Sequence, residues 1–522
     1  MDTKALRQKI LDLAIRGKLV PQDPNDEPAV VLLERIRAEK QQMVKDGKLK
    51  PKDIKNDTVI FKGDDNLHYE KFSDGSVKCI EDEIPFEVPE GWAWCRLNSI
   101  VDVRDGTHDT PTYVDKGIPL ITSKNLVEGG IDYSNVKYIS EKDAISINER
   151  SGVNIGDILF AMIGTIGNPS MVTEDILISI KNVALFKFTF SKNLSNYFVM
   201  YFLDYAQEDM KNKPSGGLQP FVSLNFLRTY LVPIPPVEEQ QRIVSILADS
   251  INKIRNIDVL KNELTASVKK AKSKILDLAI RGKLVPQDPN DEPASVLLEH
   301  IRAEKEELIR QGKIKRDKKE SVIFKGDDNS YYRLTADNKS NIIDIPFDIS
   351  DNWVWCNLSM IGSTNIGLTY KPTDIVTNGT MVLRSSNIIN GKIDLTDLVR
   401  VNSTIRENQY IQENDILICA RNGSKALVGK CAIYENANEK ASFGAFMAVY
   451  RSRFFRYVYY FLNSEFFRNT FSNDDSKQIN QLTQDMIKNT TIPLPPFTEK
   501  KRIVDAIETA FLQLDEIAND IS

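Results

Sequence analysis

The sequence contains little of the material from which most catalytic and metal sites are built. It has three histidines and five cysteines in 522 residues. The cysteines form no CxxC pair, and their odd number and scatter predict reduced thiols and argue against a zinc site. So few histidines leave little scope for histidine-based catalysis. We therefore expect no metal centre in this chain.

Long apolar runs are also missing. No segment approaches the roughly 18 consecutive apolar residues of a membrane-spanning helix, so we expect no membrane span. The first residues, MDTKALRQKILDLAIRG, lack the apolar core and the cleavage site of a signal peptide. Together with the reduced thiols, these absences predict a cytoplasmic protein.

The motifs of common enzyme classes are absent as well. The segment NGSKALVGK misses the phosphate-binding loop because five residues, not four, separate Gly423 from Gly429. There is no G-x-S-x-G nucleophile elbow. The glycine-rich cofactor turn and the acidic- or Asn-Pro-Pro-aromatic loop of an adenine methyltransferase are missing too. These absences predict a binding protein with no catalytic residues and no cofactor of its own.

The overall charge gives no simple indication of a nucleic-acid partner. The formal net charge is −5, whereas a protein that coats DNA non-specifically is expected to be basic. Residues 353–492 carry 15 Lys and Arg against 12 Asp and Glu, and residues 91–232 carry 13 against 15. Neither segment is a strongly basic module by itself.

What the chain does contain is a tandem repeat of a unit of about 260 residues. Residues 9–40 and 274–305 match at 30 of 32 positions. Weaker matches follow in the same order in both halves, with an offset that stays between 258 and 265. These are VIFKGDDN at 59 and 322, IPF at 84 and 345, WAWC at 92 and WVWC at 353, GDILFAMIG at 156 and NDILICARN at 414, YFVMYFL at 197 and RYVYYFL at 456, and VPIPPVEEQQRIV at 232 and IPLPPFTEKKRIV at 492.

The helical segments and the blocks between them differ in how far they have diverged between the two copies. The helical ends are almost unchanged, while the blocks between them share a frame and little else. A segment that meets the same partner twice should stay the same, whereas a segment that reads two different targets should differ. Recent recombination between the copies is the alternative, because it would homogenise some stretches by chance.

Helical periodicity predicts a long central helix and a shorter helix at each end. From Glu238 to Arg281 there is no Gly or Pro, and apolar residues recur every three or four positions. The C-terminal helix, Glu499–Ile521, repeats the first half of this helix, and the N-terminal helix, Thr3–Arg16 with Thr3 as its cap, repeats the second half. We expect both ends to pack on the central helix as a two-helix coiled coil. An ordinary amphipathic core helix is the alternative.

The predicted fold class is α+β, with two globular domains separated by long helices. In residues 91–233 and 353–493, short β-rich runs alternate with Gly, Asn and Ser turns. One helix is expected in each, at Tyr197–Met210 and Phe454–Phe467, with an aromatic stripe that belongs to the core because its spacing is helical. The expected segments are an N-terminal helical region (1–50, with a second helix at about 29–46), a connecting segment (51–90), a globular domain (91–233), a central helical region (234–312), a connecting segment (313–352), a second globular domain (353–493) and a C-terminal helix (494–522).

Several turns in the two globular blocks carry side chains suited to nucleic acid. Arg, Lys, Asn and Gln can pair with base edges, and Ser, Thr and glycine amides can hold phosphates. The alternative for each turn is plain surface, but recurrence at equivalent places in both halves favours the loops as a set. The candidates are Thr107, His108, Thr110, Ser123, Lys124, Asn125, Thr165, Ser215, Gly216 and Gln219 in the first block, and Tyr370, Lys371, Arg384, Ser385, Asn387, Arg421, Asn422, Ser424, Lys425, Lys477, Gln478 and Asn480 in the second.

This layout resembles the specificity subunit of type I restriction–modification enzymes. The resemblance rests on the duplicated KILDLAIRGKLVPQDPNDEPA, on the P-x-P-P-x-x-E-x-x-R-I-V helix starts at Pro233 and Pro493, and on WAWC and WVWC at the start of the variable blocks. The DGTHDTP loop also looks like a frequent element of that family's recognition domains. The resemblance covers essentially the full length, and the motifs are specific as an ordered set.

The resemblance implies a function and a set of partners. Residues 91–233 and 353–493 would be target recognition domains, each reading one half of a split site in double-stranded DNA. The long helices would form an antiparallel coiled coil that fixes the gap between the half-sites, with the two readers about a pseudo-twofold axis. Two methyltransferase subunits would dock on the near-identical helical segments, and two translocase–nuclease subunits would join them. S-adenosylmethionine would bind the methyltransferase and not this chain.

The duplicated segments supply the candidate contacts with the methyltransferase, which are Leu13, Arg16, Lys18, Leu278, Arg281 and Lys283. Two other interpretations remain open. A scaffold that holds two copies of a partner without reading DNA would have no reason to diversify its globular blocks. A nuclease fused to its own readers would need catalytic motifs, which are absent.

Overall fold

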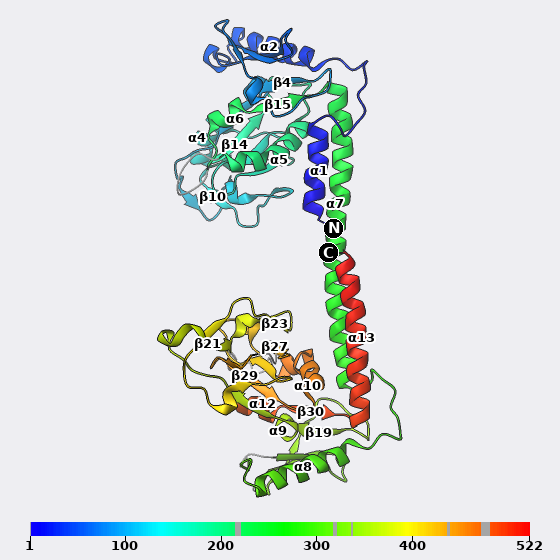
Figure 1. Ribbon diagram of the computed structural model, residues 1–522. Helices are drawn as coiled ribbons and strands as arrows, with labels where there is room; N and C mark the ends of the chain where they lie inside the picture. The colour runs from blue at the N-terminus through cyan, green and yellow to red at the C-terminus, as the bar shows by residue number, and fades with distance from the viewer. Residues whose placement is uncertain are drawn as a thin grey trace. The chain divides into compact units, whose positions relative to one another are not determined.

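The computed structural model describes residues 2–213, 221–316, 321–335, 338–435, 439–470 and 481–521. The chain forms two compact units, Met1–Leu260 and Lys261–Ser522, so the division falls where the sequence repeat places it. One helix, α7 (Val237–Ile280), contributes its first part to the first unit and the remainder to the second (Figure 1). In the part of the chain that is described, no helix is long and apolar enough to cross a membrane.

The first unit contains six helices besides α7 and fifteen strands among its described residues. The helices are α1 (Thr3–Ile15), α2 (Ala29–Lys45), α3 (Leu97–Ile100), α4 (Glu141–Ser151), α5 (Asn196–Asn212) and α6 (Leu224–Thr229). The strands are β1 (Val59–Lys62), β2 (His68–Lys71), β3 (Val77–Cys79), β4 (Ala93–Arg96), β5 (Asp102–Asp105), β6 (Tyr113–Val114), β7 (Ile118–Ile121), β8 (Leu126–Val127), β9 (Gly130–Ile131), β10 (Lys137–Ile139), β11 (Ile158–Ala161), β12 (Gly167–Met171), β13 (Ser179–Ile180), β14 (Val183–Lys187) and β15 (Leu231–Ile234).

Helix α1 lies antiparallel on the first part of α7 (Figure 1). At the start of α1 the Thr3 hydroxyl donates to the Asp258 carboxylate at 2.7 Å. Further along α1, Leu11 is buried in one core with Leu247 of α7. The apolar stripe of α1 is therefore covered by α7, as the helical periodicity predicts.

The globular part of the first unit is built on two four-stranded sheets, with strand orders β12-β11-β14-β5 and β13-β7-β10-β6. Successive side chains of β11 point to opposite faces of its sheet. Ile158 and Phe160 join the core that contains Phe198 of α5, while Leu159 packs with Ile121 of the other sheet. Because both faces are covered, this strand is a continuous apolar run instead of an alternating one.

The two ends of the globular domain lie side by side. Strand β4, which enters the domain, pairs antiparallel with β15, which leaves it, and Trp94 is opposite Pro233 in this pair. The small antiparallel sheet β1-β2-β3 precedes β4 and forms the connecting segment.

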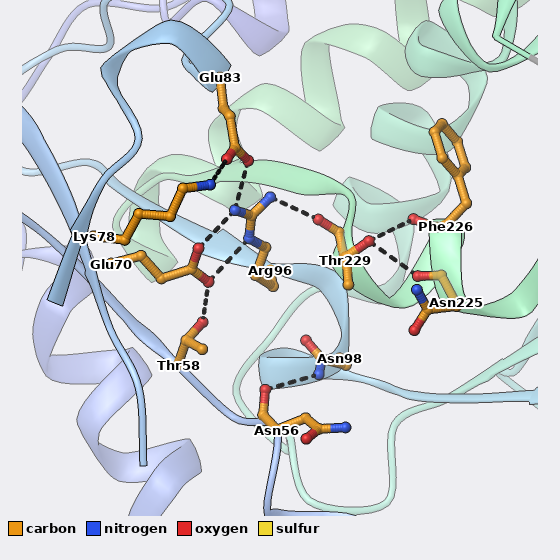
Figure 2. Close-up of polar contacts among 10 residues, drawn as sticks. All are labelled: Asn56, Thr58, Glu70, Lys78, Glu83, Arg96, Asn98, Asn225, Phe226 and Thr229. Carbon is orange, nitrogen blue, oxygen red and sulfur yellow. Dashed lines mark hydrogen bonds and ion pairs between the residues drawn. The ribbon is translucent and has the colours of Figure 1, made fainter. Parts of the chain in front are cut away.

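Arg96, the last residue of β4, connects this small sheet to the globular domain (Figure 2). Its guanidinium donates to Glu70 on β2 at 2.7 and 3.1 Å and to Glu83 at 2.7 Å. A further bond goes to the backbone carbonyl of Thr229 at the end of α6, at 2.9 Å. One arginine therefore fastens the connecting segment to both ends of the domain.

Hydrogen bonds between the oppositely charged groups of this cluster stabilise their ionised forms. Burial by itself would lower the pKa of Arg96, but the hydrogen bonds with Glu70 and Glu83 outweigh it and raise that pKa. Burial would likewise raise the pKa of Glu70, but the bonds from Arg96 and Thr58 outweigh it and lower that pKa. Glu70 is 4% exposed, so its charge depends on these partners.

The second unit repeats this plan with its own helices and strands. The helices are α8 (Ala294–Arg310), α9 (Leu358–Ile361), α10 (Phe455–Leu462), α11 (Glu465–Thr470), α12 (Gln484–Asn489) and α13 (Phe497–Ile521). The strands are β16 (Ser321–Lys325), β17 (Tyr331–Thr335), β18 (Ser340–Ile343), β19 (Val354–Asn357), β20 (Ser363–Ile366), β21 (Ile375–Leu383), β22 (Ile388–Ile389), β23 (Lys392–Ile393), β24 (Val399–Val401), β25 (Tyr410–Ile411), β26 (Ile416–Cys419), β27 (Cys431–Ile433), β28 (Ala441–Phe443), β29 (Met447–Arg451) and β30 (Thr491–Leu494).

The sheets of the second unit have the orders β20-β29-β26-β27 and β24-β21-β28-β25, and β19 pairs with β30 as β4 does with β15. Helix α13 lies antiparallel on the second part of α7, where Lys272 pairs with Asp515 at 2.5 Å (Figure 1). The Arg96 cluster is not repeated, because Arg333 and Asn357 stand at the positions of Glu70 and Arg96.

Three local predictions are wrong. The cap of α1 is Asp2 and not Thr3, because the Asp2 carboxylate accepts from the free backbone N–H of Ala5 at 2.9 Å. The predicted helix 454–467 is divided into α10 and α11, because Ser464 caps a new helix by accepting from Phe467 N at 3.2 Å. Each globular domain also contains short helices that were not predicted, including α4 in the first.

Candidate nucleic-acid interface

Two of the predicted loops of the first domain meet at a turn that the sequence analysis did not single out. Thr107 forms a backbone bridge with Lys181, and the Ser123 hydroxyl donates to the Asn182 carbonyl at 3.3 Å. The Lys181 ammonium donates to the Thr110 hydroxyl at 2.8 Å. The turn at Lys181 and Asn182 thus joins loops that are far apart in the sequence.

Among the residues of these loops, His108 has a raised pKa and hydrogen-bond partners at both ring nitrogens. Its Nδ1 lies 2.8 Å from Oδ1 of Asn182, and its Nε2 lies 3.0 Å from the Asp105 carboxylate. An imidazole donates from both nitrogens only when it is protonated. The hydrogen bond with Asn182, followed by that with Asp105, accordingly raises the pKa of His108. The ring is 59% exposed, so a protonated His108 would be accessible to a phosphate.

Two of the candidate asparagines shape their loops and do not face outward. Asn125 is 7% exposed and Asn387 is 1% exposed. The side-chain oxygen of Asn125 accepts from Thr122 N at 3.0 Å, and that of Asn387 accepts from Arg384 N at 2.9 Å. Both side chains are used within the turn and are not available to a base.

The remaining candidates of the first domain divide into exposed and undescribed residues. Lys124 and Thr165 are exposed. The predicted Ser215, Gly216 and Gln219 lie outside the described residues. The same holds for Lys477, Gln478 and Asn480 of the second domain and for the side chain of Lys425.

The second domain brings several of its predicted loops together in the same way. Asn422 donates to the Ser385 hydroxyl at 3.3 Å and accepts from Ser424 N at 2.9 Å. Arg421 forms a backbone bridge with Gln481. The loop at 421–424 is therefore joined to the loops at 384–387 and 481.

Three further candidates of the second domain differ in their surroundings. Arg384 pairs with Asp397 at 2.9 Å. Lys371 is exposed, and Tyr370 packs beside the small core around Leu368.

Five residues next to the predicted loops were not predicted from the sequence. Lys181 and Asn182 lie beside Thr107 and His108, Phe221 pairs with Ile163, and Phe446 and Gln481 lie beside Arg421. One signal was present in the sequence. Lys181 and Asn182 form a two-residue connection between β13 and β14, and asparagine is favoured where the backbone is left-handed, as it is at Asn182 with φ of 56°. Phe446 and Gln481 carry no such signal, because only strand pairing brings them next to Arg421.

The duplicated PQDPNDEP loop is held against the helix that follows the globular domain. The Glu239 carboxylate, which is 1% exposed, accepts from Gln22 at 2.8 Å and from the Trp92 indole at 3.0 Å. Burial raises the pKa of Glu239, against the effect of these two hydrogen bonds. In the second unit the same contacts measure 2.6 Å for Gln287–Glu499 and 3.0 Å for Trp353–Glu499.

The residues predicted to contact the partner differ in solvent exposure and in the contacts that they make within the chain. Arg16 lies 4.5 Å from the centroid of the Phe86 ring, and Arg281 lies 4.5 Å from that of Phe347, so both guanidinium groups are used within their own units. Leu13 and Leu278 are half-buried. Lys18 and Lys283 are exposed, which leaves these lysines accessible to a partner.

The comparisons with known proteins assign both globular domains to one class. A family model described as the type I restriction modification DNA specificity domain matches residues 89–266 and 353–522. The chain is thus a tandem pair of DNA specificity domains. It belongs to the family of type I restriction–modification specificity subunits, with two recognition domains, as the sequence motifs predicted.

Two curated relatives extend over nearly the whole chain. The EcoAI specificity subunit of Escherichia coli is 28% identical and is aligned over 97% of this chain and 88% of its own length. The EcoEI specificity subunit of the same species is 27% identical over 98% of this chain and 90% of its own length. A chain solved in a type I R-M system shares the fold, with a TM-score of 0.52, 17% identity and coverage of 84% of this chain and 94% of that chain.

Proposed function

We propose that this chain reads a bipartite, asymmetric site in double-stranded DNA, with one half-site for each recognition domain. The observation that carries the proposal is the unequal divergence of the repeat. Equivalent places in the two domains carry unlike side chains, such as Ile163 with Phe221 in the first domain and Arg421 with Gln481 in the second. Unlike readers require unlike half-sites.

The long helices would act as the spacer between the two readers. Helix α7 continues without interruption from Val237 to Ile280, a length of about 65 Å at ~1.5 Å per residue. With α1 and α13 packed antiparallel on it, we propose a coiled-coil rod that relates the two readers by a pseudo-twofold axis and sets the number of base pairs between the half-sites.

The duplicated segments would each dock one methyltransferase subunit, and two translocase–nuclease subunits would complete the complex in the cytoplasm. Packing within the chain explains why buried residues such as Leu11 are retained, but it does not explain why exposed residues such as Lys18 and Pro24 are identical at Lys283 and Pro289. A partner that meets both copies accounts for these positions. S-adenosylmethionine would belong to the methyltransferase.

Methylation mapping tests the DNA-reading part of the proposal. We expect the chain, expressed with its methyltransferase in an unmethylated host, to direct methylation to one split motif with two unlike halves and a fixed gap. Long-read sequencing of the host genome measures the motif directly. A soluble complex that leaves the genome unmethylated would favour the scaffold interpretation.

Charge reversal at the duplicated lysines tests the docking part. We expect the wild-type chain to carry two methyltransferase subunits in native mass spectrometry. Lys18→Glu or Lys283→Glu alone should leave one subunit bound, and both together should leave none. Retention of two subunits by the double variant would contradict docking at these lysines, and Lys253→Glu, on an exposed turn of α7, is the control.

A further inference from the structure

Among the described residues, each recognition domain contains one isolated antiparallel bridge, and the two bridges differ in the polarity of their side chains. In the first domain the bridge joins Ile163 to Phe221, and in the second it joins Arg421 to Gln481. The positions correspond in the repeat, with offsets of 258 and 260. The same place in the fold therefore presents apolar side chains in one domain and a hydrogen-bonding pair in the other.

Arg421 is held firmly at its backbone. Its N–H donates to the Phe446 carbonyl at 2.9 Å, and the preceding Ala420 donates to the same oxygen at 2.9 Å. On the other side, Leu482 N donates to the Ala420 carbonyl at 2.7 Å. The segment around Arg421 is thus tied to two neighbouring segments, and little backbone freedom remains to be lost when a ligand binds.

The side chain of Arg421 is oriented by an exposed aromatic ring. Its guanidinium lies 5.4 Å from the centroid of the Phe446 ring. Phe446 is 62% exposed, so it adds little to the core and leaves one face of the ring open. The two residues line a hollow of 270 Å³ together with Gln481 and Gln484. An arginine packed on an aromatic ring keeps its planar fork directed outward.

Arg421 is also free of a carboxylate partner among the described residues. Five other arginines of the same domain form ion pairs within the second unit. They are Arg384 with Asp397, Arg400 with Glu439, Arg451 with Asp415, Arg453 with Glu304 and Arg456 with Glu508. The guanidinium of Arg421 therefore has its donors available for an external acceptor.

We propose that Arg421 reads a guanine of the half-site recognised by the second domain, by donating to O6 and N7 in the major groove. This inference rests on the proposed DNA-reading function and specifies it. The bidentate fork of arginine matches the two acceptors on the guanine edge, which no other base presents in that arrangement. Phe446 is the positioning residue, and Gln481 lies beside the contact. The first domain has no such donor at the equivalent bridge, so this guanine contact is confined to one half-site.

Guanine analogues provide the test once the split motif is known. In the complex of the full chain with its methyltransferase, duplexes carrying 7-deazaguanine at one guanine at a time lack the N7 acceptor at that position. We expect one of these duplexes to bind the wild-type complex about tenfold more weakly than unmodified DNA. Arg421→Lys keeps the charge and loses the fork, so it should bind unmodified DNA about tenfold more weakly and show no further loss at that guanine.

Two more variants separate an effect on the guanine contact from an effect on the stability of the complex. Phe446→Leu should reduce the penalty of the same 7-deazaguanine without changing the melting temperature of the complex. Arg400→Lys, a matched change at an arginine paired with Glu439, should behave like the wild type. The inference is overturned if neither half-site contains a guanine, or if Arg421→Lys and wild type lose the same affinity at every modified guanine. A wild-type complex that shows no split motif at all would instead contradict the proposed function.

Discussion

Replacement of Arg96 by alanine is expected to lower the free energy of unfolding of the first unit by about 3–5 kcal/mol. The side chain of Arg96 is 13% exposed, and its removal leaves Glu70, whose side chain is 5% exposed, without its main counter-charge (Figure 2). Removing one partner of a buried pair costs more than the pair contributes, because the remaining charge has lost its water. The connecting sheet should then separate from the globular domain.

Hydrogen exchange followed peptide by peptide would localise the effect. Protection should fall in β1–β4 of the first unit and stay unchanged in β16–β19 of the second, where Asn357 stands in place of Arg96. Arg400→Ala, which breaks the more exposed pair with Glu439, should cost less than about 1 kcal/mol. Equal losses in the two variants would show that the Arg96 cluster does not stabilise the unit.

The deficit of Arg96→Ala should depend on pH. In the wild type the pKa of Glu70 is lowered, so its contribution is present above the unfolded value of about 4.5 and is lost as pH falls through the folded-state pKa. In the variant only burial remains as the main effect, and burial raises the pKa of Glu70. The difference between variant and wild type should therefore be largest at neutral pH and shrink as the pH falls toward 4.

Lys500→Gln is expected to stabilise the second unit by about 1–3 kcal/mol at pH 7. Lys500 is 8% exposed, and its ammonium lies 3.8 Å from the centroid of the Phe454 ring and 4.1 Å from that of Phe497. Burial, with a smaller effect of the Arg453 charge, lowers the pKa of Lys500 to about 7. Attraction to the two rings offsets part of the cost, which is why the expected gain is smaller than the pKa shift alone implies.

The first unit already shows how glutamine fits at this position. Gln240, the counterpart of Lys500, is fully buried, donates to the Pro235 carbonyl at 2.9 Å and accepts from Ser195 N at 3.0 Å. The residue that corresponds to Pro235 is Pro495, two residues before α13 begins, so we expect its carbonyl to accept from a glutamine at 500.

The pH dependence distinguishes this effect from a general change in packing. Between the folded-state pKa near 7 and the unfolded value near 10.5, the unfolded chain binds more protons than the folded chain, so wild-type stability rises with pH. Lys500→Gln lacks this rise. Denaturant unfolding at pH 7, 8.5 and 10 should show the advantage of the variant shrinking as the pH increases. An advantage that is constant over this range would contradict the burial of a charged lysine.

The sequence predicted the frame of the fold because the repeat and the long apolar periodicities are strong signals. The central helix was expected from Glu238 to Arg281 and lies at Val237–Ile280. Helix α4 was missed because its sequence, EKDAISINERS, buries only Ala144 and Ser151, so it has no clear apolar stripe. Its cap, Ser140, is one serine among many in the turns.

The site was harder to predict than the fold. Loop residues such as His108 were identified by type, but type does not reveal burial, and Asn125 is used inside its own turn. Phe446 could not be identified as a site residue from the sequence, because an aromatic residue near a strand is expected in the core. Its exposure follows from the pairing of distant segments around Arg421, which no local pattern records.

The pairing of β4 with β15 has a consequence for how such chains change over time. Because the strand that enters the recognition domain and the strand that leaves it are neighbours, the domain is inserted into the helical frame at a single point. The loop–helix contact itself uses Trp92, which precedes β4, and Glu239, which follows β15. A different domain between these positions would leave this contact intact if it offered α1 a helix that packs as α5 does, so the domain could be exchanged as one module without a change in the helices.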